Sequence, residues 1–148
     1  MKSARSITAL CVLLLASSLA VLAEKDESLQ DLIAKAEAAH PKDRPALFIE
    51  VAERQLKAAD ELYNAGKSDE AKTCVDDVAT YSGKAQDAAL QSGSRLKQTE
   101  ISLRKMAARL RDVARTLNYE DQAPVQTAAD RLESLRTGLQ KRMFGKSK

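Results

Sequence analysis

The chain has 148 residues, a formal net charge of +3, 3% aromatic residues and only one His. That length suits a single ordinary domain, and one His is too few for the metal centres and most acid–base sites that proteins build from this side chain. Strong helix formers dominate the composition, whereas the β-branched and aromatic residues typical of strands are sparse. We therefore expect an all-helical protein.

The first 23 residues have the pattern of a secretory signal peptide. A short basic segment precedes an apolar run over residues 7–22, and small residues lead up to the charged cluster that begins at Glu24. This order indicates cleavage after Ala23 and export, either to the periplasm or as a secreted protein. A membrane anchor is the alternative, but a spanning helix needs about 20 apolar residues, and this run is shorter and contains two serines. We expect a helical bundle domain over residues 24–148.

The exported chain would contain a single cysteine, Cys74, because Cys11 lies within the signal peptide. An intramolecular disulfide could not form, so packing alone would hold the fold together. Cys74 is either a buried small side chain or the link of a disulfide-bonded dimer, and its position within a helix favours burial.

Apolar spacing and punctuation predict three helices in the first half of the chain. The first covers residues 26–39 and ends before a proline, since the residue preceding proline is driven out of the helical region. The second is capped by Asp43 and ends near Gly66, and Ser68 caps the third. The predicted core face of the second helix comprises Phe48, Val51, Ala52, Gln55, Ala59 and Leu62.

The segment AADELYNAGKSDEAKTCVDDV resembles the turn of a tetratricopeptide helical hairpin. Small and apolar residues stand at the spacings of that repeat at Ala59, Leu62, Gly66, Ala71, Val75 and Val78. The resemblance covers one hairpin, residues 59–78, and it implies antiparallel pairing of two helices and a scaffold that binds proteins.

A long apolar seam leaves two alternatives open for the middle of the chain. Apolar or small residues step by four and three from Ala71 to Leu117, which allows one continuous helix over residues 68–117. The alternative is a break at residues 91–94, where Gly93 ends one helix and Ser94 caps the next. We favour the break, because it gives two helices similar in length to their neighbours and a compact bundle.

The last helix is predicted to start at a cap on Asp121, with Pro124 in its first turn. Residues 145–148 would form a frayed tail. The expected core side chains of this helix are Val125, Ala128, Ala129, Leu132, Leu135, Leu139 and Met143. The predicted fold is an antiparallel up-and-down bundle of four long helices with a short helix at the N-terminus.

Catalytic and metal-binding patterns are sparse. His40 follows Glu37 at the Glu-x-x-His spacing of di-iron bundles, but those centres need the same step on a second helix, and there is no second His. A haem attachment motif, a glycine-rich phosphate loop and a nucleophile elbow are all missing from the sequence. We predict no catalytic residue, no cofactor, no metal site and no small-molecule substrate.

Basic residues form the one pattern that suggests a binding surface. Lys97, Arg104 and Arg111 recur every seven residues, and Arg115 follows one turn later, so all four fall on one flank of a helix. Near the C-terminus, basic residues stand beside Met143 and Phe144. The candidate binding residues are Lys97, Arg104, Arg111, Arg115, Lys141 and Arg142.

Three interpretations of this basic column remain. Residues 24–92 carry nine Lys and Arg against 15 Asp and Glu, and residues 93–148 carry 13 against six, so the two halves could simply neutralise each other. The column could instead serve an exported scaffold that binds a protein partner or self-associates. It could also dock on an anionic membrane or polymer. A nucleic acid is disfavoured, because aromatic stacking residues are few.

Overall fold

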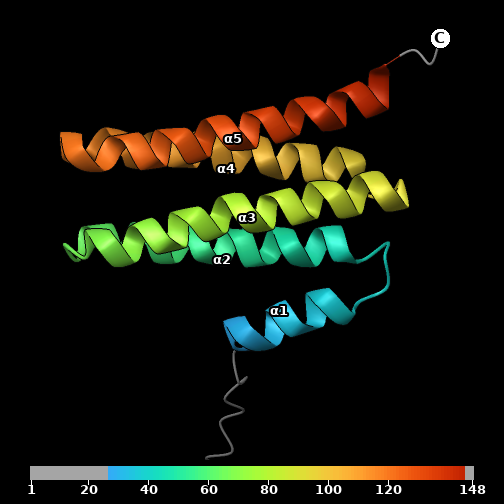
Figure 1. Ribbon diagram of the computed structural model, residues 1–148, viewed down its shortest axis with the longest axis horizontal. Coiled ribbons are helices and arrows are strands. Elements are labelled where there is room, and N and C mark those ends of the chain that lie inside the picture. Colours follow the sequence, from blue (N-terminus) through green and yellow to red (C-terminus); the bar gives the residue numbers. More distant parts are fainter. Residues whose placement is uncertain (1–26, 146–148) are drawn as a thin grey trace, which may run out of the picture.

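The structure is a computed structural model that describes residues 27–145, and every regular element in that range is a helix. The helices are α1 (Leu29–Ala38), α2 (Arg44–Asn64), α3 (Ser68–Ser92), α4 (Leu96–Thr116) and α5 (Tyr119–Phe144) (Figure 1). They pack together as a bundle, so the predicted all-helical fold is confirmed. The predicted signal peptide and residues 146–148 of the predicted tail lie outside the described residues.

Two antiparallel hairpins make up the bundle, α2 with α3 and α4 with α5 (Figure 1). The hairpins pack on each other mainly through α3 and α5, with further contact between α2 and α4, whereas α2 and α5 do not touch. It follows that α2 and α5 occupy opposite corners of the four-helix arrangement, whereas α3 and α4 also contact each other. Helix α1 packs on α2, on the side of the first hairpin that faces away from the second (Figure 1), and its Glu37 carboxylate also pairs with Lys84 of α3.

The core forms where the predicted apolar stripes of the helices pack against one another. Leu103, Leu110, Leu132 and Leu139 from the second hairpin are fully buried, and each such side chain contributes about 1.5–3 kcal/mol through burial. Small residues from α3 face them and let the helices approach closely, namely Ala71, Val75, Val78, Ser82, Ala85 and Ala89. Two of the predicted core residues near helix ends, Leu62 and Met143, are only half-buried.

Helix α1 begins after Ser28, whose hydroxyl accepts a hydrogen bond from the backbone N–H of Asp31 at 3.1 Å. It ends at Ala38, one residue before the predicted end. Leu32 and Ala36 form its buried side, and the Arg54 guanidinium donates to the carbonyl oxygen of Glu27 at 2.6 Å. The Arg44 guanidinium donates to the carbonyl oxygens of Glu37 and Ala39, both at 3.0 Å. This short helix is therefore tied to α2 by apolar burial and by charged hydrogen bonds to the backbone at both of its ends.

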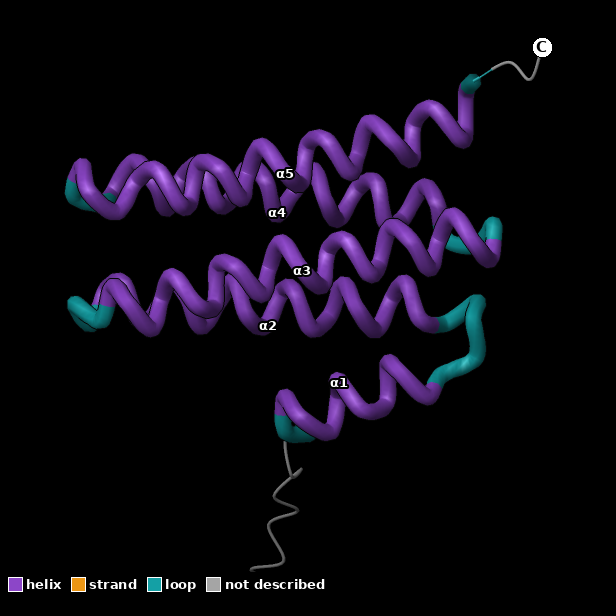
Figure 2. The backbone as a smooth tube through the Cα atoms, in the orientation of Figure 1, coloured by secondary structure: helices purple, strands orange, loops and turns teal. Residues whose placement is uncertain are grey.

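The predicted alternative of a continuous helix over residues 68–117 is wrong, and the break is confirmed. Helix α3 ends at Ser92 and α4 starts at Leu96, with a tight reversal between them (Figure 2). Gly93 and Arg95 both adopt left-handed backbone angles, with φ of 64° and 56°. The apolar phase continues across the turn because both helices bury their stripes in the same core.

Three predicted caps behave differently from expectation. Lys67 rather than Ser68 precedes α3, Arg95 rather than Ser94 precedes α4, and α5 starts at Tyr119 with Asp121 inside its first turn. The Ser68 hydroxyl instead donates to the Asp121 carboxylate at 2.9 Å. That bond joins the two hairpins, so the two polar residues serve tertiary packing instead of capping their own helices. Asp43 does precede α2, but its side chain makes no capping hydrogen bond.

Candidate functional site

The predicted basic column lies along the side of α4 that borders α5. The buried side of α4 includes Thr99, Leu103, Met106, Leu110 and Val113. At about 100° per residue, the four basic side chains of the column fall within an arc of about 40° on a neighbouring side of the helix. Lys97 and Arg115 are five helical turns apart, which is roughly 27 Å.

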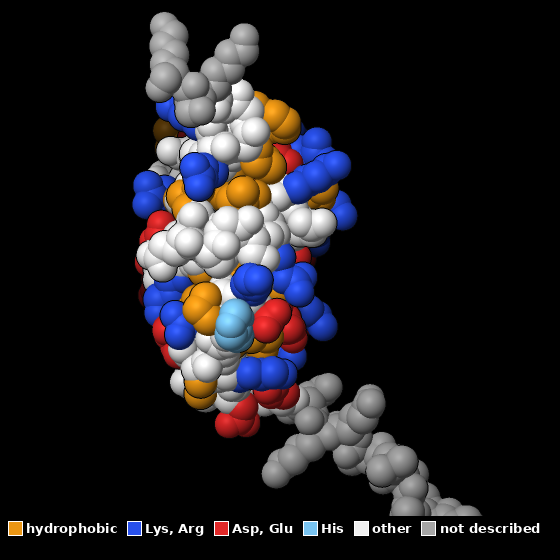
Figure 3. Space-filling model, turned by 90° about the vertical axis from the view of Figure 1, so that its right-hand side faces the viewer, with side chains coloured by type: hydrophobic (Ala, Val, Ile, Leu, Met, Phe, Trp, Pro, Cys, Tyr) orange, Lys and Arg blue, Asp and Glu red, His pale blue; other side chains and the backbone are white. Residues whose placement is uncertain are grey.

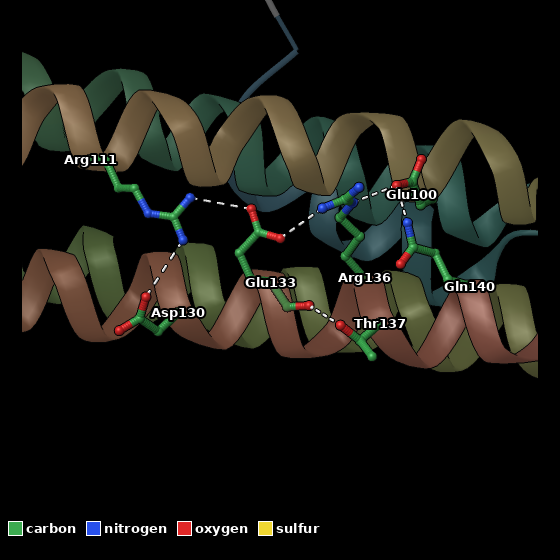
Figure 4. Close-up of polar contacts among 7 residues, drawn as sticks. All are labelled: Glu100, Arg111, Asp130, Glu133, Arg136, Thr137 and Gln140. Carbon is green, nitrogen blue, oxygen red and sulfur yellow. Dashed lines mark hydrogen bonds and ion pairs between the residues drawn. The ribbon is translucent and has the colours of Figure 1, made fainter.

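Arg111 is used to hold α4 against α5. Its guanidinium lies 3.2 Å from the Glu133 carboxylate and 3.5 Å from the Asp130 carboxylate, both on α5 (Figure 4). Arg136 continues the chain of alternating charges, because it donates to Glu133 at 3.0 Å and to Glu100 at 2.5 Å. Figure 4 shows these side chains pointing toward one another between the two helices.

Glu100 is the buried end of this network. Only 9% of the residue is exposed, and its carboxylate accepts hydrogen bonds from Arg136 and, at 3.1 Å, from the Gln140 amide. Burying a carboxylate is costly unless donors of this kind satisfy its oxygens. For Glu133, desolvation alone would raise the pKa, but the hydrogen bonds from Arg136 and Arg111 prevail and hold its pKa below the ordinary value of 4.5. The network therefore holds α4 and α5 together.

Lys97 and Arg104 are different, because both are exposed and neither forms an ion pair with any of residues 27–145. Arg115 is exposed too, and its one ion pair, at 2.8 Å, is with Asp112 on the same helix. Exposed pairs of this kind contribute only about 0.3–0.5 kcal/mol. Arg115 can therefore leave Asp112 for another acidic partner at a small cost in free energy. The structure thus divides the predicted column into one structural arginine and a basic face, defined here as Lys97, Arg104 and Arg115.

Lys141 and Arg142 do not extend the basic face as one patch. Both are exposed in the last turn of α5, but adjacent helical residues point about 100° apart. Phe144 follows them and is 78% exposed. Three further exposed cations, Lys42, Lys105 and Arg131, have no ion-pair partner within the described range. The sequence analysis missed them, because they stand outside the seven-residue repeat.

Charge is unevenly divided between the two hairpins. Residues 95–144 carry 11 Lys and Arg against six Asp and Glu, whereas residues 44–92 carry six against nine. On the face shown in Figure 3, most of the acidic side chains lie in the lower part of the view. Among the described residues, only the Arg95–Asp43 and Arg109–Asp60 pairs join a base of the second half to an acid of the first. Mutual neutralisation therefore explains few of the basic residues.

Other places on the molecule are less suited to a ligand. A cavity of about 410 Å³ lies beside Phe48 and Lys84, but the Lys84 ammonium already pairs with Glu37 and sits 5.5 Å from the ring centres of Phe48 and Tyr81. His40 is exposed on the loop before α2. Within residues 27–145, His, Cys, Asp and Glu side chains form no group that could hold a metal ion.

Cys74 is half-buried and packs against the core without being enclosed by it. Burial raises the pKa of its thiol, and the carboxylates of Asp77 and Glu70 raise it further. Because the thiolate is the reactive form of cysteine, these surroundings disfavour reaction at this position.

Helices in the described part of the chain are too short or too polar to cross a bilayer. Comparison of the sequence and structure with models of protein families, with curated proteins and with solved structures found no match. The basis for a functional proposal is therefore the chemistry of the surface.

Proposed function

We propose that this protein is an exported, non-enzymatic binding module that presents the basic face of α4 to an acidic surface on a protein partner. The observation that supports this proposal is the exposure of Lys97 and Arg104, which have no ion-pair partner within residues 27–145. Neighbouring arginines on the same hairpin hold the bundle together. The free cations therefore stand on a helix whose position is fixed.

Such a face suits association that is fast and sensitive to salt. Each exposed ion pair contributes only about 0.2–1 kcal/mol, so several must form at once for measurable affinity. Complementary charge accelerates encounter and selects partners more than it strengthens a complex. A rigid row of cations roughly 27 Å long matches a row of acids on another helix better than it matches a single small anion.

The test is binding of a fluorescent poly-glutamate peptide to residues 24–148, which include every described helix. The variant K97E/R104E removes the two unpaired cations of the basic face. The control K42E/R131E makes the same change in net charge at two exposed residues elsewhere. We expect at least a tenfold loss of affinity, or about 1.4 kcal/mol, for the first variant and a much smaller loss for the control. Equal losses would mean that net charge alone attracts the peptide and that the basic face is no site.

An anionic membrane or polymer surface is the second candidate, and one observation favours it. Phe144 is 78% exposed beside Lys141 and Arg142, a combination that suits the interface of an anionic bilayer. If this candidate is correct, K141E/R142E/F144S should abolish retention on vesicles that contain phosphatidylserine. In that case K97E/R104E should also weaken retention, because the flank of α4 would share the contact. Full retention of both variants would exclude it.

A further inference from the structure

We propose that the acidic partner of the basic face is a second copy of this same chain, which docks through the outer side of α3. This inference rests on the proposed function, because it assigns an occupant to the same face.

The outer side of α3 carries an acidic stripe, defined as Asp69, Asp76 and Asp87. All three residues are exposed. Asp76 and Asp87 form no ion pair with any described residue, and Asp69 has only a loose one, 3.9 Å from Lys72 on its own helix. The stripe is therefore as free of internal partners as the basic face is.

The two rows have the same spacing. Asp69 and Asp76 are seven residues apart, as are Lys97 and Arg104. Asp69 and Asp87 are 18 residues apart, as are Lys97 and Arg115. Eighteen residues are five helical turns, or roughly 27 Å, so the ends of each row point in the same direction. If α3 of one copy lies parallel to α4 of another, three ion pairs form at once: Asp69 with Lys97, Asp76 with Arg104 and Asp87 with Arg115.

One position of the basic column lacks an acidic counterpart, and the structure explains it. The residue opposite Arg111 in this register is Gly83, and a Cβ at Gly83 would have open space around it. Arg111 is already paired with Asp130 and Glu133. An acid on the second copy is therefore missing only where the arginine has its partners within its own chain.

The position of the rows determines the kind of assembly. Because the acidic stripe and the basic face lie on two different helices, a copy that binds through its α3 leaves its own α4 free for another copy. Contacts between different surfaces of identical subunits make rings or open chains, in contrast to the closed dimer that a self-complementary patch would give. We expect head-to-tail chains at low salt that dissociate as surface charges are screened.

A zero-length carbodiimide cross-link between Asp69 and Lys97 tests both the contact and its register. These residues begin α3 and α4, and the whole of α3, roughly 36 Å long, separates them within one chain. A direct bond between them can therefore form only between two copies. We expect residues 24–148 at high concentration and low salt to give cross-linked dimers in which mass spectrometry finds this bond. Bonds confined to other pairs, or monomers alone, would overturn the inference.

Charge-swapped variants keep the test independent of net charge. The single changes D76K and R104E should each reduce the Asp69–Lys97 cross-link, by about fivefold for a change of about 1 kcal/mol. The double change D76K/R104E exchanges the middle pair and restores the original net charge, so it should restore the cross-link. The double change D76K/R131E has that net charge too, but it should remain deficient. Equal yields from the two double variants would contradict the proposed register.

Poly-glutamate binding separates this inference from the proposed function. The variant D76K retains the basic face and should bind the peptide at least as tightly as the wild type, because it is more positive and self-associates less. If it does so while the wild type gives no Asp69–Lys97 cross-link, the second copy is not the partner and the proposed function stands. If the wild type fails to bind the peptide, the proposed function fails as well.

Discussion

Glu100 is the only charged residue among the buried side chains of the described range, and its environment shows what the interhelix network contributes. Removing the partner of a buried charge costs several kcal/mol, because the remaining charge stays desolvated. We predict that R136M lowers the free energy of unfolding, because the buried Glu100 carboxylate loses its charged donor. Replacing both partners, as in E100Q/R136M, should recover most of that loss. Urea denaturation measures the free energy of unfolding of both variants. An equal loss in R136M and E100Q/R136M would mean that lost packing, and not the unpaired charge, causes the destabilisation.

Glu133 gives the network a dependence on pH. Its folded-state pKa lies below the ordinary 4.5, so the stability that it contributes is present above the unfolded-state pKa and is lost as the pH falls through the folded-state pKa. We predict that E133Q is less stable than the wild type at pH 7 and that the difference shrinks on acidification to about pH 3. Urea unfolding at the two pH values checks this. A difference that stays constant with pH would show that the carboxylate charge is irrelevant.

The sequence placed the basic residues of α4 on the correct flank but could not separate their roles. Lys97 and Arg111 stand at equivalent positions of the same seven-residue repeat. They differ in what lies opposite, since Asp130 and Glu133 of α5 reach Arg111. Which acid faces which base depends on how far α5 slides along α4, and this register is set by side-chain packing over the whole hairpin. A pattern within one helix does not contain that information.

At the scale of the helices, the turn between α3 and α4 is the feature that decides the shape of the molecule. Arg95 has a φ of 56°, and a left-handed backbone costs a non-glycine residue about 1–2 kcal/mol. We predict that R95G raises the free energy of unfolding by about 0.5–1 kcal/mol. Gly in a helix interior has the opposite effect, so R131G on α5 should lower it by about 1 kcal/mol. Thermal unfolding measures the stability of both variants. Equal destabilisation of R95G and R131G would contradict the left-handed backbone at Arg95.

Helix α1 is the element with the weakest attachment. It has ten residues and packs on α2, with one ion pair to α3 between Glu37 and Lys84, and an isolated helix of that length is unstable in water. We predict that its backbone amides exchange hydrogen faster than those of α2 to α5. L32A should accelerate that exchange further while leaving the core of α4 protected. L103A, by contrast, should lower the global stability by about 2–5 kcal/mol. Uniform acceleration in L32A would mean that α1 is part of the cooperative core.

On the scale of the whole molecule, composition and apolar spacing were sufficient to predict the fold class and the number of helices. Gly66 and Gly93, both with positive φ, marked two of the turns correctly. The partners of the helices could not be predicted, because the stripe of α3 fits α5 as well as α4 by its spacing. Two of the three misplaced caps have the same origin, since Ser68 and Asp121 satisfy each other across the two hairpins.

We propose above that the exposed cations of α4 form the docking face of this molecule. The most direct test of this proposal is an NMR titration of isotope-labelled residues 24–148 with the poly-glutamate peptide, recorded in D76K to suppress self-association. We predict that the largest shift changes fall on the backbone amides of α4 near Lys97 and Arg104 and on the facing side of α5. Changes centred on Lys141 and Arg142 alone, or spread evenly over every exposed cation, would contradict it.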